Sequence, residues 1–441
     1  MNKNLLTQKV HNSLLSLVAD EGIYASGKED VYGCIFGRDS SITVLKILKS
    51  CSNNSRTFDV NKLKLLKAAR QTLLTLASLQ GKNFNPDSGE EPGKFIHEYR
   101  TSNLERLLSL EKPWYVYPDG ILRNYDSIDS TPLGLIAIYK YYMKTKDQEF
   151  LYRVLQVVED GLMWIMTHGD KDGDALLEYD IPKDRKFGGL LVHSWTDSHE
   201  SIQRSDGSMP LYPIAPVEAQ GYAWLALKLW ERFFSENPSC TAIGDFSSML
   251  KKHARLMKIS FNRQFIFRSE GLYFAAQALD GKKNKIETVT GNPLLLLWAS
   301  YRRRGKTYSI IDEAFVGDFV KRAFKPDLFD RNAGIRTMSK KSVTFNPAQH
   351  SYHNGSFWPK LNGMAHEGLV LWRFYKEAKA LKRATIKPIK FFGTPIELYL
   401  IDESGKYVEF RGLNGQVSCR NQAWSAAAAL DLLTERRIRV N

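Results

Sequence analysis

The sequence predicts an all-α protein, an (α/α)6 toroid with long loops and small β-hairpins at one end. Apolar residues recur at helical spacing along the whole chain and indicate about twelve helical blocks. The connections between these blocks alternate between long and short, and short connections join helices into antiparallel hairpins. Six hairpins linked in this order place every long loop at the same end of the ring.

The predicted helices begin near residues 4, 40, 60, 129, 147, 215, 243, 293, 308, 357, 376 and 422. The long connections run roughly over 20–38, 82–127, 169–214, 265–292, 323–355 and 392–421. Connections longer than about 12 to 15 residues tend to be functional or disordered. These six are rich in Trp, Tyr, Asn, Asp and Gly, a composition that favours ordered, sugar-sized recognition surfaces. Segments 272–278 and 407–410 are expected as hairpins within them, and residues 1–441 as one domain.

Composition excludes several classes of function. Hydrophobic residues at 43% and charged residues at 25% are typical of a folded globular protein. The formal charge is +14, but Lys and Arg are spread over the helical blocks, which favours a solvated basic surface over a nucleic-acid partner. No stretch approaches the ~20 apolar residues of a membrane span. The widely spaced Cys34, Cys51, Cys240 and Cys419 predict neither a zinc site nor a disulfide framework, so a cytoplasmic protein is expected.

The first long loop ends in Arg38 and Asp39 at the start of a predicted helix. A guanidinium beside a carboxylate offers a rigid fork of donors and a charged acceptor, which suits the vicinal hydroxyls of a sugar. The alternative is that Asp39 or Ser40 caps the helix.

The second long loop contains His97, Glu98 and Arg100, and aromatic rings alternate with carboxylates along it. This pattern favours stacking on the apolar face of a sugar together with hydrogen bonds to its hydroxyls. A structural ion pair between Glu98 and Arg100 would explain the same charges.

The third long loop carries Trp195 and Asp197, followed by His199 and Glu200. A carboxyl group beside an indole can be partly desolvated, which raises its pKa and keeps it protonated near neutrality, as a general acid requires. We therefore predict Asp197 as a catalytic acid. A helix cap or a salt bridge is the structural alternative.

The same loop begins with Asp170, Asp172 and Asp174, a spacing that resembles a calcium loop. Ile181 occupies the place where an EF-hand loop needs a bidentate Glu, so a solvated turn without metal is expected.

The helix that follows opens with Pro216, and Glu218 lies in its first turn, where a carboxylate complements the helix dipole. Structure alone could therefore explain Glu218, whereas Gln220 has no such explanation. Both are predicted as secondary substrate contacts.

The fifth long loop contains Arg336 and then Tyr352, His353, Asn354 and Trp358 before the next helix. Trp and Tyr seldom occupy turns for structural reasons. We predict that these residues contact the sugar, although they could also form a plug that fills the toroid.

In the sixth long loop, Glu397 lies between apolar neighbours, an uncommon setting for a solvated carboxylate. Two carboxylates on opposite rims of one cavity are the requirement for glycoside cleavage. A buried ion pair is the alternative for Glu397, and Glu403 and Glu409 are alternative bases.

Taken in order, these motifs resemble the glycogen-debranching amylo-α-1,6-glucosidase and glucoamylase group of six-hairpin glycosidases. The matching segments are 37–40, 96–100, 195–198, 216–221, 351–358, 397–398 and 422–425. The resemblance implies an inverting exo-glycosidase on α-linked glucosides, without metal or cofactor. It implies Asp197 as general acid, Glu397 as the base that activates water, and carboxyl groups about 6.5 to 9.5 Å apart. Arg38 and Asp39 would grip the terminal sugar, and Trp195, His353 and Trp358 would line its subsite.

The chain departs from the group at two places. His199 and Glu200 follow the acid, where the group usually has an aromatic or Gly and then Asp, and Ile396 separates Glu397 from Pro395. No β-sandwich is predicted before the toroid, so short oligosaccharides or small glycosides are expected as substrates.

Two other functions fit parts of the sequence. A sugar epimerase on the same fold would need paired catalytic histidines, for which His193, His199, His350 and His353 are candidates. A helical interaction scaffold would show similarity between repeats, and none is evident. Sugar binding without turnover is a further alternative, and the sequence leaves the oligomeric state open.

Overall fold

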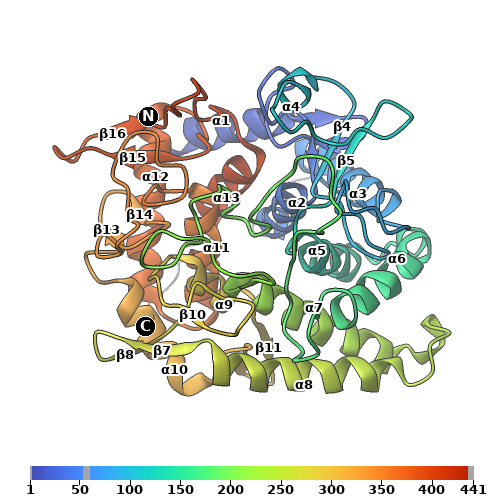
Figure 1. Cartoon of the computed structure of the whole chain (residues 1–441). Coiled ribbons are helices and arrows are strands. Elements are labelled where there is room, and N and C mark those ends of the chain that lie inside the picture. Colours follow the sequence, from blue (N-terminus) through green and yellow to red (C-terminus); the bar gives the residue numbers. More distant parts are fainter. Residues whose placement is uncertain (1, 53–59, 436–441) are drawn as a thin grey trace.

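The helices of this chain close into a double ring. The computed structural model describes residues 2–52 and 60–435, and within these ranges it contains thirteen α-helices. Six of them form an inner ring around the centre of the molecule (Figure 1): α2 (Gly37–Ser52), α5 (Ser130–Thr145), α7 (Val217–Glu236), α9 (Leu295–Trp298), α11 (Pro359–Leu371) and α13 (Ala423–Thr434). Each packs against the next, and α13 packs against α2, which closes the ring. The predicted (α/α)6 toroid is therefore confirmed.

A second layer of helices surrounds the inner ring: α1 (Lys3–Leu15) on α13, α3 (Val60–Ser78) on α2, α6 (Gln148–Met166) on α5, α8 (Phe246–Gln264) on α7, and α12 (Tyr375–Phe392) on α11. The sixth outer helix, α10 (Glu313–Ala323), packs on the 3-10 turn at Asn292–Leu294 that leads into α9. A further short helix, α4 (Glu105–Leu108), lies inside the second long loop.

Local sequence explains which layer a helix joins. Inner helices are buried on almost all sides, as expected for helices that are apolar all round. In α13, Ala423 and Ala426–Ala429 are all buried, and their small side chains allow close approach of α1, α2, α11 and α12. Outer helices keep a polar face: α6 is capped by Asp147, whose Oδ1 accepts the Phe150 N–H at 2.9 Å.

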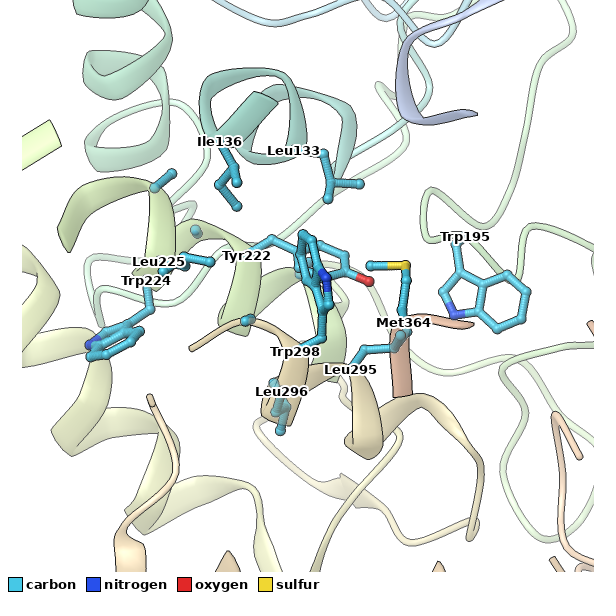
Figure 2. Packing of buried hydrophobic residues seen from close by; sticks show 14 of the residues in the cluster. Leu133, Ile136, Trp195, Tyr222, Trp224, Leu225, Leu295, Leu296, Trp298 and Met364 are labelled. Carbon is cyan, nitrogen blue, oxygen red and sulfur yellow. The ribbon is translucent and has the colours of Figure 1, made fainter. Parts of the chain in front are cut away.

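The interior between neighbouring inner helices is filled by large apolar side chains. Figure 2 shows Tyr222 of α7, Trp298 of α9 and Met364 of α11 meeting near Leu133 of α5, with Trp195 at the edge of this cluster. Trp195 thus links the core of the ring to the loops at one end.

Short strand pairings fasten the long loops to one another. Loops one and two share the sheet of β3 (Ile35–Phe36), β4 (Glu98–Arg100) and β5 (Leu122–Asn124). Loops three and four share that of β6 (Ala215–Pro216), β9 (Ala278–Leu279) and β10 (Lys285–Ile286). Isolated bridges Thr290–Met338, Phe357–Tyr399 and Ser26–Gln422 join loops four to five, five to six and one to six. The loops are therefore gathered at one end of the ring, as the alternation of gaps predicts.

The remaining strands form two-stranded hairpins: β1 (Val18–Ala19) with β2 (Gly22–Ile23), β7 (Ile266–Ser269) with β8 (Leu272–Ala275), β11 (Tyr301–Arg303) with β12 (Lys306–Tyr308), β13 (Phe329–Asp330) with β14 (Gly334–Ile335), and β15 (Tyr399–Ile401) with β16 (Tyr407–Glu409). The hairpins expected near 272–278 and 407–410 are among them.

Some predicted boundaries differ from the structure. The helix expected near 308 begins at Glu313, because residues 306–308 pair as β12 instead. The helix expected near 293 is a 3-10 turn followed by the four residues of α9, and Leu294–Leu297 are fully buried there. A run of apolar residues has no helical face to reveal its length. The joint at residues 53–59 lies outside the described ranges. No helix within them is long and apolar enough to cross a membrane.

Candidate active site

A pocket opens at the end of the toroid where the long loops gather. It is lined by residues of loops one, three, five and six and of the helices that follow them: Tyr32, Phe36, Arg38, Asp39, Trp195, Asp197, Tyr352, His353, Trp358, Glu397, Gln422 and Trp424. The cavity is narrow: its volume is about 40 Å³, below the range of about 300–1,000 Å³ that is usual for ligand pockets. We call it the central pocket.

The N-termini of inner helices converge on the central pocket. Arg38 and Asp39 lie in the first turn of α2, Trp358 is the residue before α11, and Gln422 the residue before α13. Helix N-termini carry a partial positive charge that favours nearby anions. This arrangement explains how so many carboxylates can be gathered in one buried region.

Arg38 is the hub of an ion-pair network. Its Nη1 donates to Asp129 Oδ1 at 3.3 Å and to the Ser194 carbonyl at 3.0 Å, and its Nη2 donates to Asp197 Oδ2 at 2.8 Å. Asp39 Oδ2 lies 3.8 Å from Nε. The guanidinium that the sequence predicts as a sugar clamp is thus largely occupied in orienting carboxylates, Asp197 among them.

Asp197 is the most accessible carboxylate of this network, with 23% of its side chain exposed. Burial raises the pKa of the Asp197 carboxyl, while the Arg38 guanidinium opposes that rise. The direction agrees with the prediction of a carboxyl whose pKa is raised by desolvation. Burial also raises the pKa of Asp39 to about 7.

Glu397 lines the same pocket as Arg38, Asp39 and Asp197, and it is 1% exposed. The Tyr352 hydroxyl donates to its Oε1, and the Cys419 N–H donates to its Oε2 at 2.9 Å. Burial raises the pKa of Glu397 to about 7, and these two hydrogen bonds limit the rise. Glu403 is exposed in the β15–β16 turn and Glu409 pairs with Arg420 at 2.5 Å, so neither lines the pocket.

Aromatic rings form the walls and floor. The Trp358 and His353 rings stack with centroids 5.0 Å apart, and Trp195 meets both edge to face. The Trp195 Nε1 donates to Asn292 Oδ1 at 3.0 Å, which fixes the indole. Beneath the floor, Lys360 Nζ lies 3.8 Å from the centroid of the Trp195 ring and 5.0 Å from that of Trp424.

His353 is held as a neutral imidazole. Burial lowers its pKa well below the usual value, and Arg38 and Lys360 lower it further. The Ser198 N–H donates to Nδ1 at 3.3 Å, so the proton lies on Nε2. Nε2 is buried without a hydrogen-bond partner among the described residues, which leaves a donor for a ligand.

A second hollow adjoins the central pocket, and Tyr32, Phe36 and Asp197 line both. It also includes His97 and Glu98 from loop two. Glu98 accepts from Arg100 Nε at 2.6 Å, so the structural ion pair is present. We call this space the outer hollow. Asp197 lines both the outer hollow and the central pocket, whereas Glu397 lines only the central pocket.

Of the six predicted contacts outside the central pocket, His97 and Glu98 line the outer hollow, and the other four line neither space and contact protein atoms. Gln220 bonds both the N–H and the carbonyl of Leu177, at 2.8 and 2.7 Å, which anchors loop three to α7. Glu218 is fully buried and accepts from Asn292 at 3.3 Å. A structural explanation was expected for Glu218 but not for Gln220, whose bonds to Leu177 the sequence did not reveal.

The other two lie in loop five. Arg336 stacks on Phe357 with its guanidinium carbon 4.4 Å from the ring centroid, and Asn354 Nδ2 donates to the Glu200 carbonyl at 2.8 Å. Asn354 thus ties loop five to loop three.

Sequence reasoning also missed four residues that line the central pocket: Tyr32, Phe36, Gln422 and Trp424. Tyr32 and Phe36 lie in the first loop, just before the matching segment 37–40, and Gln422 and Trp424 lie inside the matching segment 422–425, although neither was singled out as a contact. Adjacency to Arg38 or to the start of α13 was the available signal.

Two of the three aspartates with calcium-like spacing pair with a lysine. Lys283 Nζ lies 2.8 Å from Asp172 Oδ2 and 3.0 Å from Asp174 Oδ2. Asp170 accepts the N–H groups of Gly173 and Ala175, both at 2.9 Å. These carboxylates already have partners in a cationic side chain and the loop backbone.

No protein-family model and no curated protein matches the sequence. Solved structures do match in fold: the GH63 mannosylglycerate hydrolase from Thermus thermophilus in complex with glucose has a TM-score of 0.63, with 15% identity over 97% of this chain and 99% of that chain. The same enzyme in complex with Tris and D-glycerate has a TM-score of 0.62 at the same identity and coverage. The likeness shows a shared six-hairpin fold over almost the whole of both chains.

Proposed function

We propose that this protein is an inverting, exo-acting glycoside hydrolase on α-linked glucosides of short length, with Asp197 as general acid and Glu397 as general base. The observation that carries the proposal is the placement of two carboxyl groups from distant loops in one aromatic-walled pocket. Inverting hydrolysis needs one carboxyl to protonate the leaving oxygen and another to activate water.

The two hollows distinguish the roles of the two carboxyls. A glycosidic oxygen joins the sugar that is cleaved off to the leaving group, so the acid must reach the boundary between their sites. Asp197 borders both the central pocket and the outer hollow, whereas Glu397 lines the central pocket. The sugar would occupy the central pocket, with its leaving group in the outer hollow.

Glu397 suits the role of general base because hydrogen bonds from the protein fix its carboxylate and leave lone pairs free to accept another hydrogen bond. Its two oxygens each accept one protein hydrogen bond and keep a further lone pair for the proton of a water molecule. A pKa of about 7 matches a base that works near neutrality. The water would attack the anomeric carbon from the face opposite the leaving oxygen.

The central pocket would receive a single sugar ring once its lining side chains move apart, because its volume is only about 40 Å³. Trp195, Trp358 and Trp424 are buried and close its floor, which favours removal of a terminal sugar. The Nε2–H of His353 and the carboxyl of Asp39 would bind hydroxyl groups. Neither role needs a metal or cofactor, and the substrate is a neutral glycoside. We include residues 1–441 in one catalytic domain and place it in the cytoplasm.

The epimerase alternative lacks a second histidine in the pocket lining. His193 stacks on Tyr179 and bonds the Leu190 carbonyl at 3.0 Å, and His199 and His350 are exposed. His353 has its Nδ1 occupied by Ser198. The carboxyl pair is therefore the better-supported machinery.

A proton NMR time course tests the proposal with isomaltose, panose, maltotriose and α-glucosyl fluoride. The β-anomer of glucose should appear first. Since the solved structures of the same fold include a mannosylglycerate hydrolase, matching α-mannosides belong in the panel and would reassign the sugar if they alone are cleaved.

Asp197→Asn should lower kcat on the oligosaccharide by about 10²–10⁴-fold, the usual contribution of a positioned acid. It should lower the rate on the fluoride much less, because fluoride leaves without a proton. His199→Ala removes an exposed neighbour and is the matched control, with activity retained. Release of the α-anomer first, or an unchanged rate in Asp197→Asn, would contradict the mechanism.

A further inference from the structure

The outer hollow borders Asp197 on the side away from Glu397 and extends to the β4 strand and α4. Its apolar wall includes Phe36 and Trp114, and Trp114 is 8% exposed. Aromatic rings of this kind offer the apolar face of a sugar a surface to pack on. Burial lowers the pKa of His97 well below its usual value, so its ring is neutral, and its Nδ1 has no hydrogen-bond partner among the described residues.

The charges that line this hollow are mostly negative. Four carboxylates, Glu29, Asp30, Glu98 and Glu105, face two guanidiniums, those of Arg100 and Arg106. Asp197 adds a fifth carboxyl at the boundary with the central pocket.

Neither guanidinium is a ready anion site. Arg100 donates to Glu98 at 2.6 Å, to the Val31 carbonyl at 2.7 Å and to the Asn103 carbonyl at 3.4 Å, so its fork is occupied. Arg106 is exposed, bonds Gln416 Oε1 at 3.3 Å and follows Glu105 in the chain. An exposed charge beside an opposite one contributes little binding energy in water.

We propose that the outer hollow accepts an uncharged, polyhydroxylated leaving group, a sugar or a polyol, and discriminates against a leaving group that carries a carboxylate. The inference rests on the proposed function and names the leaving-group class for the same site. Hydroxyl groups can donate to the surrounding carboxylates and pair with the His97 ring. An anion would instead lie beside an excess of like charges, of which Glu29 and Glu105 are exposed, and this disfavours it to a degree that depends on salt.

The test uses three substrates that share the sugar identified by the NMR panel: its α-glycosyl fluoride, its α-glycoside of glycerol and its α-glycoside of glycerate. The fluoride needs only the central pocket, and the other two differ by a single carboxylate. We expect kcat/KM for the glycerol glycoside to exceed that for the glycerate glycoside by about tenfold or more, and the ratio to narrow as salt screens the charges.

The double variant Glu29→Gln/Glu105→Gln should bring the ratio of the two kcat/KM values closer to one, because it removes two of the repelling charges. Glu111→Gln changes an exposed glutamate of the same loop outside the hollow and should leave the ratio unchanged. Cleavage of the fluoride with equal or faster cleavage of the glycerate glycoside would overturn the inference. Failure to cleave the fluoride would instead overturn the proposed function and this inference with it.

Discussion

At the residue scale, the hydrogen bond from Tyr352 to Glu397 links pocket geometry to pH dependence. The hydroxyl lowers the pKa of Glu397, against the rise caused by burial that brings it to about 7. A base must be deprotonated, so kcat/KM should fall as the pH drops through about 7. Tyr352→Phe removes the hydrogen bond, raises the pKa of Glu397 and should move this acid limb to higher pH.

The pH profile of kcat/KM checks this prediction. Tyr407→Phe is the control, because it removes a hydroxyl that donates to the Asn332 carbonyl at 2.8 Å, outside the pocket. Its acid limb should coincide with that of the unmodified protein. An acid limb that stays in place in Tyr352→Phe would argue against Glu397 as the base.

Residue types indicated which residues line the central pocket better than they indicated what each residue contacts. Asp197 and Glu397 do line one pocket, in keeping with the motif resemblance. Arg38 lines it too, yet its guanidinium donates to Asp129, Ser194 and Asp197. Partners more than 90 residues distant decide such a role, and no local pattern records them.

At the scale of the element, the start of α2 depends on a glycine. A Cβ on Gly37 would overlap the carbonyl oxygen of Ile96 and approach Ser130 Oγ to 3.1 Å. Gly37 also donates its N–H to the His97 carbonyl at 2.9 Å, which joins α2 to the segment before β4. Close approach of these two backbones positions Arg38 and Asp39 beside the pocket.

Gly37→Ala should therefore destabilise the protein by about 1–3 kcal/mol, the usual cost of overpacking, and should lower activity because α2 must shift. Urea unfolding and kcat/KM measure the two effects. Gly317→Ala in α10 is the control: nothing lies within 4 Å of its Cβ position, so alanine should stabilise the helix by about 0.5–1 kcal/mol. Equal stabilities of the two variants would contradict the packing argument.

Local sequence marks some of the helix boundaries, whereas others depend on contacts with distant parts of the chain. The start of α11 is marked by Pro359 and the α5–α6 joint by the cap at Asp147, both visible in sequence. The brevity of α9 and the late start of α10 were not, because Leu294–Leu297 are apolar and fully buried and residues 306–308 pair with β11.

At the scale of the whole molecule, closure of the ring brings together α2, α11 and α13. Lys46 of α2 donates to the Gly363 carbonyl at 3.0 Å, to Glu367 at 2.6 Å and to Asp431 of α13 at 3.2 Å. Its side chain is 2% exposed. This buried cation therefore joins the first inner helix to the last two, where the ring closes.

Lys46→Met should lower the free energy of unfolding by about 1–3 kcal/mol, because it leaves the buried Gly363 carbonyl without this donor and leaves Glu367 and Asp431 paired with Lys49, at 3.4 and 3.2 Å. Urea unfolding measures the change. Lys306→Met breaks an ion pair with Glu313 in which both side chains are more than half exposed, and should change stability by less than about 0.5 kcal/mol. Equal effects of the two substitutions would show that the ring does not depend on this contact.

The sequence by itself determined the helical periodicity, the alternation of short and long connections and hence the toroid with its loops at one end. It also identified the segments that carry Asp197, Glu397 and the aromatic walls, because these signals are local. Only the tertiary structure decided that Gln220, Arg336 and Asn354 serve the scaffold, that Tyr32 and Trp424 line the pocket, and that Asp197 borders two hollows. The reason is physical: a side chain's partners depend on which distant segments the closed ring brings side by side.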